Sequence, residues 1–424
     1  MFLNFVFTFF AFVAFDAYCH EIDHHSACPY RQVFYPCKCS VITYDSVNYY
    51  SQITCKGVNG LQLKDIFHSA RYANVSRYYD IIEITEVPLL NLCCEDLFGG
   101  FHFKKIKITF STICVINYNA FLTTEHFTKE ITLINTHFTA NLADGNQLFK
   151  TIRKFKDLRG LFIISSNLEA LPEDALRSPN RHFGQDLEVI RICNTKISRI
   201  PDYAFYDLPR LIWIDFGNNY ITHVNSKTFA LRSTIDTPIE ISLSANNLTS
   251  SGITDGAFSG IRRQKVEIYI TENRLDTLYE QIFNPLLRTE YVFLFVDHNP
   301  FVCDCRHRWL FNHKEDNQYH LKGMTCREDG RSIWEKNFDH CDKAKLVDTK
   351  VDIFGRCCRR HNHQQQRYEH KITYIPEPPV RIQQHHQHKI SYIKKLPTQI
   401  REYNHQIEAP HNSDIHPQLQ QHHF

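Results

Sequence analysis

One short stretch of the chain has the residues and the spacing of a catalytic metal site. His20, Glu21 and His24 spell H-E-x-x-H at the start of the segment HEIDHH (20–25). On a helix this spacing places both histidines on one face, where they bind Zn²⁺ while the glutamate activates a metal-bound water. Such a site therefore requires a helix that is packed on a folded domain.

The residues around the motif do not predict that helix. Residues 1–19 form an apolar segment of signal-peptide length, with Ala14 and Ala17 near a plausible cleavage point. Cleavage near Cys19 would make 20–27 the N-terminus of the mature chain, which is the part of a domain that is least often ordered. We therefore expect a signal peptide at 1–19, a disordered N-terminus at 20–27 and no metalloprotease site.

The composition is that of a globular, extracellular chain. Hydrophobic residues make up 43% and aromatic residues 13% of the sequence, which is enough for a substantial core, and the formal charge of +2 favours no nucleic-acid partner. After the first segment, no apolar stretch is long enough to span a membrane. The 15 cysteines suit an oxidising compartment. We expect a secreted protein without a membrane anchor or a cofactor.

Most of the cysteines lie in two clusters that bracket a long segment nearly free of such grouping. The clusters are Cys28, Cys37, Cys39 and Cys55, followed by Cys303, Cys305, Cys326 and Cys341. Each cluster has a C-x-C pair that could ligate zinc, but an oxidising compartment favours disulfides over metal-binding thiolates. Sequence alone leaves the pairing open.

Between the clusters, one apolar pattern occurs nine times. Its clearest copies are LIWIDFGNNYI (211–221), PIEISLSANNL (238–248) and KVEIYITENRL (265–275). Alternating apolar residues predict a short strand with one buried face, and strands repeated at intervals of 24 to 30 residues predict a stacked solenoid. The first apolar anchor of each copy is Ile82, Ile106, Ile131, Leu161, Ile190, Ile214, Ile241, Ile268 or Leu294.

Two further positions recur in the pattern. The ninth is Asn219, Asn246, Asn273 and Asn299 in the later copies, where a side-chain amide can bond the backbone of neighbouring turns; the earlier copies have Val87, Ser111, Thr136, Ser166 and Thr195 there. A second core residue follows seven of the nine strands and predicts an apolar spine. The spine residues are Leu97, Phe121, Leu176, Phe205, Phe229, Phe258 and Phe283.

The pattern resembles the extracellular leucine-rich repeat family over Cys28 to Cys341. The resemblance implies an α/β-type horseshoe solenoid with a parallel concave sheet, an irregular convex side and disulfide caps at both ends. It divides the chain into an N-terminal cap at 28–60, about nine repeats at 61–299 and a C-terminal cap at 300–347, the last marked by NPFVCDC and Trp309. The cap pairings it implies are Cys28–Cys39, Cys37–Cys55, Cys303–Cys326 and Cys305–Cys341.

Within that family the chain is similar to secreted arthropod repeat proteins, which include the non-catalytic subunits of Oplophorus-luciferin 2-monooxygenase. The shared features are the CPxxxxxxPCxC opening, early repeats with Thr or Ser at the Asn position, and no membrane anchor. This similarity implies a partner-binding or stabilising role without catalysis.

The strand residues that alternate with the anchors would line the concave face, where such solenoids usually bind partners. Exposed aromatic residues in a row indicate a protein partner. Strands shifted by one position would instead bury the same residues. The expected binding residues are Phe110, Ile134, Phe162, Ile164, Arg191, Trp213, Asp215, Glu240, Glu267, Tyr269, Phe293 and Phe295, with Lys105, Lys107, Val189 and Glu272 beside them.

The sequence shows no set of residues arranged for catalysis. Cys193, expected on a concave strand, is the one candidate nucleophile and has no evident base, so we expect no enzyme. Cys93 or Cys94 could form a disulfide with Cys114, which lies in the next repeat. Cys357 and Cys358 could bind each other or another chain and give a disulfide-linked oligomer.

The remaining features are a biased tail and two sequons. Residues 348–424 are rich in His and Gln and predict disorder, with His385, His386 and His388 as weak candidates for zinc or copper. An alternative function is thus that of a structural matrix component, crosslinked or metal-binding through this tail and the spare cysteines.

Asn74 and Asn247 begin N-x-Ser/Thr sequons and are expected to carry glycans.

Overall fold

A computed structural model of the chain describes residues 28–29, 32–43, 49–177, 183–232, 237–261 and 263–341. The chain divides into two units at Val347, and every described residue lies in the first unit. The expected signal peptide, HEIDHH, the cysteines at 357 and 358 and the histidine-rich tail lie outside the described residues.

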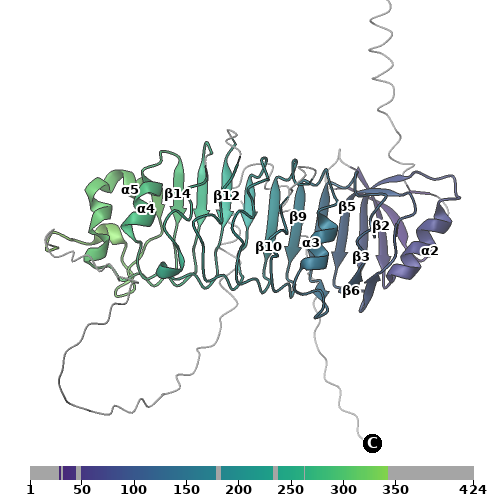
Figure 1. The fold of residues 1–424 in the computed structure, drawn as a ribbon, viewed down its shortest axis with the longest axis horizontal. Helices are drawn as coiled ribbons and strands as arrows, with labels where there is room; N and C mark the ends of the chain where they lie inside the picture. Colours follow the sequence, from purple (N-terminus) through teal and green to yellow (C-terminus); the bar gives the residue numbers. More distant parts are fainter. Residues whose placement is uncertain are drawn as a thin grey trace, which may run out of the picture. The chain divides into compact units, whose positions relative to one another are not determined.

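Twelve strands of the described residues form one sheet, drawn as a row of arrows in Figure 1. Neighbouring strands are parallel except for the first pair, which is an antiparallel hairpin in the N-terminal cap. In sheet order the strands are β1 (Lys38–Thr43), β2 (Tyr49–Lys56), β3 (Tyr78–Thr85), β5 (His102–Thr109), β7 (Glu130–Ile134), β9 (Gly160–Ile164), β10 (Val189–Cys193), β11 (Trp213–Asp215), β12 (Ile239–Ser242), β13 (Val266–Tyr269), β14 (Val292–Phe295) and β15 (Leu321–Lys322).

The register of the parallel strands follows the nine anchors. Ile82 pairs with Ile106, and each anchor then pairs with the next as far as Ile268 with Leu294. All nine anchors are buried in one continuous core. The predicted repeat solenoid with a parallel sheet is therefore confirmed.

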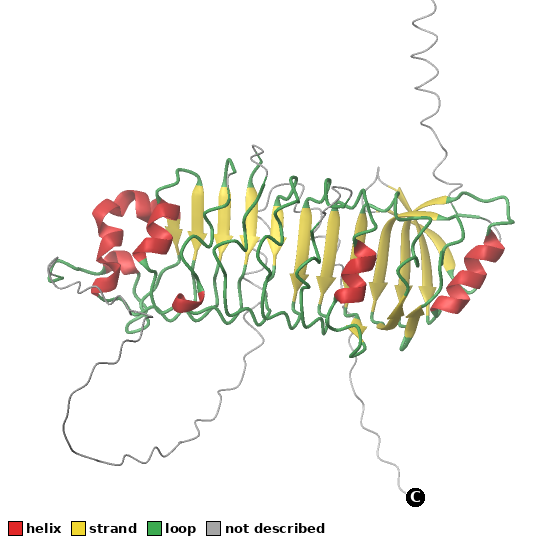
Figure 2. Cartoon of the chain, in the orientation of Figure 1, coloured by secondary structure: helices red, strands yellow, loops and turns green. Residues whose placement is uncertain are grey.

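The segments that connect the strands carry helices and a second, smaller sheet, as Figure 2 shows by colour. The helices are α2 (Gly60–Ala70), α3 (Asn146–Ile152) and α4 (Glu280–Leu287). The small sheet is parallel and consists of β4 (Leu90–Leu92), β6 (Thr112–Ile116) and β8 (His137–Phe138). Its apolar side chains enter the same core as the anchors, so the early repeats are held together by two sheets.

The predicted apolar spine is present in the later repeats. The rings of Phe205 and Phe229 stack with centroids 5.6 Å apart, and those of Phe229 and Phe258 with centroids 5.8 Å apart. All three rings are buried. In each of these repeats one aromatic side chain therefore fills the core behind the sheet and packs against the ring of the next repeat.

The asparagines at the ninth repeat position form a ladder of hydrogen bonds between repeats. The Nδ2 of Asn246 donates to the carbonyl of Phe216, one repeat earlier, at 2.9 Å and to that of Leu243 at 3.0 Å. Its Oδ1 accepts from the N–H of Ile221 at 2.9 Å. At the same position in an early repeat, the hydroxyl of Ser111 makes two bonds, to the carbonyl of Thr109 and from the N–H of Val87.

The residue before each ladder position adopts the left-handed conformation. This conformation costs about 1 kcal/mol or more for a residue with a side chain, and it turns the chain from the sheet toward the core. The ladder bonds hold the turn in place and offset this cost. The left-handed residues are Glu86, Phe110, Asn135, Ser165, Asn194, Asn218, Ala245, Glu272 and His298.

Disulfide caps close both ends of the described solenoid. The bonds are Cys28–Cys39 and Cys37–Cys55 at the N-terminal end, and Cys303–Cys326 and Cys305–Cys341 at the C-terminal end. The C-terminal cap contains the 3₁₀ helices η3 (Cys305–His313) and η4 (Ile333–Glu335), the helix α5 (Lys314–His320) and the sheet's last strand. It covers apolar surface that the final repeat would otherwise expose.

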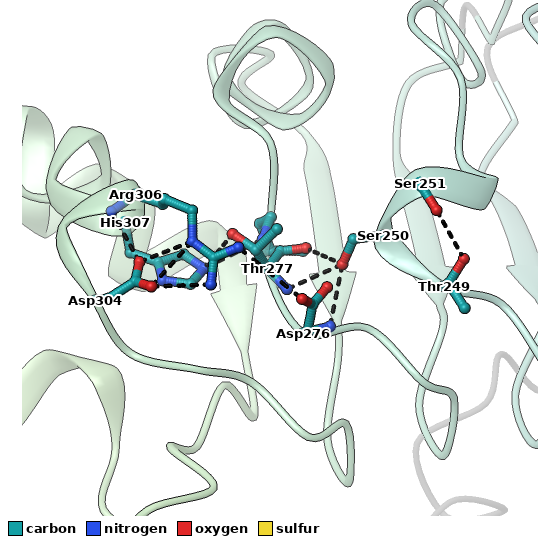
Figure 3. A network of polar contacts seen from close by, with 9 residues as sticks. Thr249, Ser250, Ser251, Asp276, Thr277, Asp304, Arg306 and His307 are labelled. Atoms are coloured by element: carbon teal, nitrogen blue, oxygen red, sulfur yellow. Dashed lines mark hydrogen bonds and ion pairs between the residues drawn. The ribbon is translucent and has the colours of Figure 1, made fainter. Parts of the chain in front are cut away.

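A buried polar network attaches this cap to the last repeats (Figure 3). The hydroxyl of Ser250, at the start of η2 (Ser250–Gly252), donates to the carbonyl of Thr277 at 2.6 Å and accepts from the N–H of Asp276 at 3.0 Å. The Nε2 of His307 accepts from the N–H of Leu278 at 3.2 Å. Burial lowers the pKa of His307 to about 4, which keeps the ring neutral and its Nε2 an acceptor at neutral pH.

Asn246→Ala tests the ladder. The substitution removes the bonds to three backbone carbonyls and leaves the buried N–H of Ile221 without its acceptor, so we expect a loss of about 1 to 3 kcal/mol in the free energy of unfolding. Denaturant unfolding measures this loss. Ser251→Ala, at an exposed hydroxyl in the same repeat, is the control and should change little. Equal stability of the two variants would contradict a structural role for the ladder.

Candidate functional site: the concave face

The strand residues that alternate with the anchors form two rows across neighbouring strands. One row runs from Lys105 through Glu130, Gly160, Val189, Trp213, Glu240 and Glu267 to Phe293. The other runs from Lys107 through Thr132, Phe162, Arg191, Asp215, Ser242 and Tyr269 to Phe295. We call this surface the concave face. The strands are not shifted by one position, because the anchors themselves pair and point into the core.

Four of the expected binding residues lie on the concave face but are not exposed. Phe162 and Trp213 are each 1% exposed, Asp215 is 8% exposed and Glu240 is 4% exposed. The expectation of exposed side chains at these positions is therefore wrong. Val189, beside them in the row, is also buried.

Packing between neighbouring strands explains much of this burial. The Arg191 guanidinium lies over the Trp213 ring, 4.6 Å from its centroid. Within strand β9 itself, the Phe162 ring lies over Gly160, where a Cβ would come within 2.7 Å of it. Because parallel strands are only about 4.8 Å apart, large side chains in adjacent positions cover one another. The centre of the concave face is therefore a packed layer.

Phe110 does not occupy the strand position that the sequence suggested. It is the left-handed turn residue that follows β5, with φ 47°, and it is 49% exposed. It lies at the edge of the sheet, and its assignment to the concave row is wrong. Ile134 and Ile164 are the last residues of β7 and β9, pair with each other and are half-buried.

A cluster of three polar side chains, Arg191, Cys193 and Asp215, lies at the centre of the concave face. The Nε of Arg191 donates to the Oδ2 of Asp215 at 3.1 Å, and the Sγ of Cys193 is 3.6 Å from the same oxygen. Burial, followed by the charge of Asp215, raises the pKa of Cys193 to about 12. A thiol held in its neutral form is a poor nucleophile. The indole N–H of Trp213 is buried in this layer without an acceptor.

The early part of the concave face is occupied by ion pairs. The Nζ of Lys105 lies 2.6 Å from a carboxylate oxygen of Glu130, and that of Lys107 lies 2.9 Å from one of Glu83. These pairs connect adjacent strands and are partly buried. They neutralise the lysines that the sequence suggested as binding residues.

The late part of the concave face carries partly exposed aromatic side chains. We define the aromatic patch as Tyr269, Phe293, Phe295 and Tyr319. The rings of Tyr269 and Phe295 stack with centroids 4.3 Å apart, and the centroids of Phe293 and Tyr319 are 5.5 Å apart. Tyr319 is 61% exposed, and the other three are half-buried.

Tyr319 was missed by the sequence analysis because it comes from α5 in the cap rather than from a repeat strand. The one feature of the sequence that could have pointed to Tyr319 is that the C-terminal cap directly follows the last repeat strand. The Glu267 carboxylate borders the patch. Its Oε1 lies 2.6 Å from the Nζ of Lys265, and its Oε2 accepts from the hydroxyl of Tyr269 at 3.3 Å. Burial, then the carboxylates of Glu240 and Glu267, raise the pKa of Tyr269, so its hydroxyl stays protonated.

Two groups of potential metal ligands occur in the C-terminal cap. They are Cys305, His340 and Cys341, and Cys303, Cys326 and Glu328. The cysteines in both groups are joined in the cap disulfides and offer no thiolate, so neither group fits a zinc site.

In the part of the chain that the structure describes, no helix is both long and apolar enough to cross a bilayer. A family model for the leucine rich repeat matches residues 185–231. Mouse Podocan is 28% identical over 138 residues, which are 32% of this chain and 21% of Podocan, so the chain spans about a fifth of that relative's length.

A solved octameric complex of Latrophilin 3, Unc5D and FLRT2 contains a chain that matches 62% of this chain and 91% of its own length. The identity is 14% and the TM-score 0.33. The repeat match, the anchors in register and the capped parallel sheet define the fold of this chain as a leucine-rich repeat solenoid.

Trp213→Ala tests the packed layer. Because the ring is buried between Val189, Arg191 and Glu240, its removal should lower the free energy of unfolding by about 3 to 5 kcal/mol, with a clear fall in melting temperature. Tyr220→Ala, at a ring that is 56% exposed, is the control and should melt close to the wild type. An unchanged melting temperature for Trp213→Ala would show that this ring is a surface residue.

Proposed function

We propose that the chain is a secreted, non-enzymatic leucine-rich repeat protein that binds a protein partner through the late part of its concave face. The aromatic patch is the observation that carries this proposal. It is the part of the concave face where aromatic side chains are partly accessible and a carboxylate lies at their border.

The chemistry of the patch suits a protein partner better than a small molecule. A few residues carry most of the binding energy at protein interfaces, and aromatic side chains inside a polar rim are enriched among the residues of such interfaces. The patch is spread over two strands and a cap helix and lies on a rigid sheet. The packed layer and the ion pairs beside it hold that sheet in one shape, which lowers the entropy cost of binding.

The similarity to non-catalytic subunits of Oplophorus-luciferin 2-monooxygenase supports a partner-binding or stabilising role. The proposal includes a signal peptide at 1–19, a cap at 28–60, repeats at 61–299, a cap at 300–347 and a tail at 348–424. The partner is extracellular, and the chain needs no cofactor for this role.

Secretion predicts N-linked glycans on two asparagines. Asn74 is exposed, and Asn247 lies beside the ladder residue with its side chain partly accessible. We expect both to be glycosylated in the protein recovered from a eukaryotic secretory host. Intact mass before and after enzymatic deglycosylation measures this. An unchanged mass would contradict secretion through that pathway.

Phe293→Ala and Phe295→Ala test the binding surface. Once a partner has been isolated with the wild-type protein, titration calorimetry of each variant should show a loss of about 2 kcal/mol, roughly thirtyfold in affinity. Tyr220→Ala is the matched control, since it removes an exposed aromatic ring away from the concave strands. The proposal fails if the control loses as much affinity as the two patch variants, or if these bind like the wild type while remaining folded.

A further inference from the structure

Two adjacent cysteines that the fold does not use structurally lie in contact. The Sγ atoms of Cys93 and Cys94 are 3.2 Å apart, and neither residue forms a disulfide. The disulfide bond length is about 2.05 Å, so the sulfurs need to approach by roughly 1.2 Å to bond. Both residues are partly exposed, at the end of β4 and beside the small sheet.

The backbone on both sides of the pair is anchored to the next repeat. Asn117 donates from its own N–H to the carbonyl of Leu92 at 2.7 Å and from Nδ2 to the carbonyl of Cys93 at 3.0 Å. After the pair, the N–H of Asp96 donates to the carbonyl of Asn119 at 3.0 Å. The two thiols are therefore held next to each other by bonds that do not depend on the thiols.

The helix α2 fixes the other side of the same segment. Its first residue, Gly60, lies so close to the backbone of Asn91 that a Cβ there would be 1.5 Å from the carbonyl oxygen. The hydrogen bond with Cys93 and burial raise the pKa of Cys94, and the charge of Lys64, on this helix, lowers it in part. The pair thus lies on a rigid base at the surface.

The other free thiols in the described residues are placed differently. Cys114 donates from Sγ to the carbonyl of Leu90 at 3.3 Å, across the small sheet. Cys193 is buried. The contact between sulfurs therefore favours Cys93 with Cys94 over the link from either of them to Cys114 that the sequence left open.

We propose that Cys93 and Cys94 form a reversible thiol–disulfide couple that is oxidised by low-molecular-weight disulfides. One thiolate attacks the small disulfide, forms a mixed disulfide and releases one small thiol. The neighbouring thiolate then attacks the protein sulfur of the mixed disulfide and releases the second small thiol. The pair loses two electrons and two protons, and the small disulfide gains them.

The bond formed in this way closes a small ring and is easily reduced. Adjacent Cα atoms are about 3.8 Å apart, below the usual range of about 4.4 to 6.8 Å for disulfides. Strained, exposed disulfides have higher reduction potentials than structural ones and are the labile or regulatory ones. We therefore expect this bond to open before the four cap disulfides.

Peptide mapping of the purified full chain tests the proposal. The protein is treated with oxidised glutathione, blocked with iodoacetamide and digested with trypsin. Cleavage after Arg77 and Lys104 places both cysteines in one peptide, and cleavage after Lys107 and Lys129 places Cys114 in another. We expect the first peptide to lose two hydrogen atoms, about 2 Da, and to carry no carbamidomethyl group.

Two variants separate the possible outcomes. Cys114→Ser should leave the oxidised peptide unchanged, while Cys94→Ser should convert Cys93 to a lasting mixed disulfide with glutathione. Mild dithiothreitol should restore two alkylatable thiols while the cap disulfides stay intact. A peptide joined to the one that contains Cys114, or thiols at 93 and 94 that stay reduced in folded protein, would overturn the proposal.

Discussion

The hydrogen bonds between each ladder residue and the preceding repeat are the interaction on which the rest of the structure depends. A strand of three to eight residues that ends in a left-handed turn is not stable by itself, because the turn leaves backbone groups pointing into the core. Asn246 supplies an acceptor for one such group and donors for others. Once these bonds are made, the anchors of neighbouring repeats are in register and the alternate residues face outward.

The residue type at the ladder position changes along the chain, and so do the elements that pack behind the sheet. Early repeats have hydroxyl residues at the ladder position and make fewer bonds there, but they carry the small sheet β4–β6–β8 in the connecting segments. Later repeats have asparagine and the stacked phenylalanine spine. The concave face follows a similar order, from ion pairs through a packed layer to the aromatic patch. The aromatic patch brings partly exposed rings from two strands and α5 together.

The features that repeat were predictable from sequence, and the features that depend on neighbours in space were not. Ile214 was identified as an anchor because the apolar pattern recurs at every copy. Trp213 was correctly placed on the opposite face, but its burial depends on Arg191 from the adjacent strand, and no periodic signal reports that contact. Phe110 was misassigned because an apolar residue at a left-handed turn looks like one more strand position. Tyr319 was missed because it belongs to a cap helix.

The measurement that tests the central claim most directly is site-specific photo-crosslinking in the extracellular fluid of the source organism. Benzoylphenylalanine is placed at position 293 in the aromatic patch and, separately, at position 220, where the native ring is exposed away from the concave strands. If the patch is the binding surface, position 293 gives a discrete crosslinked product that unlabelled wild-type protein competes away, and position 220 gives none. A competed product from position 220 alone would contradict the proposed function.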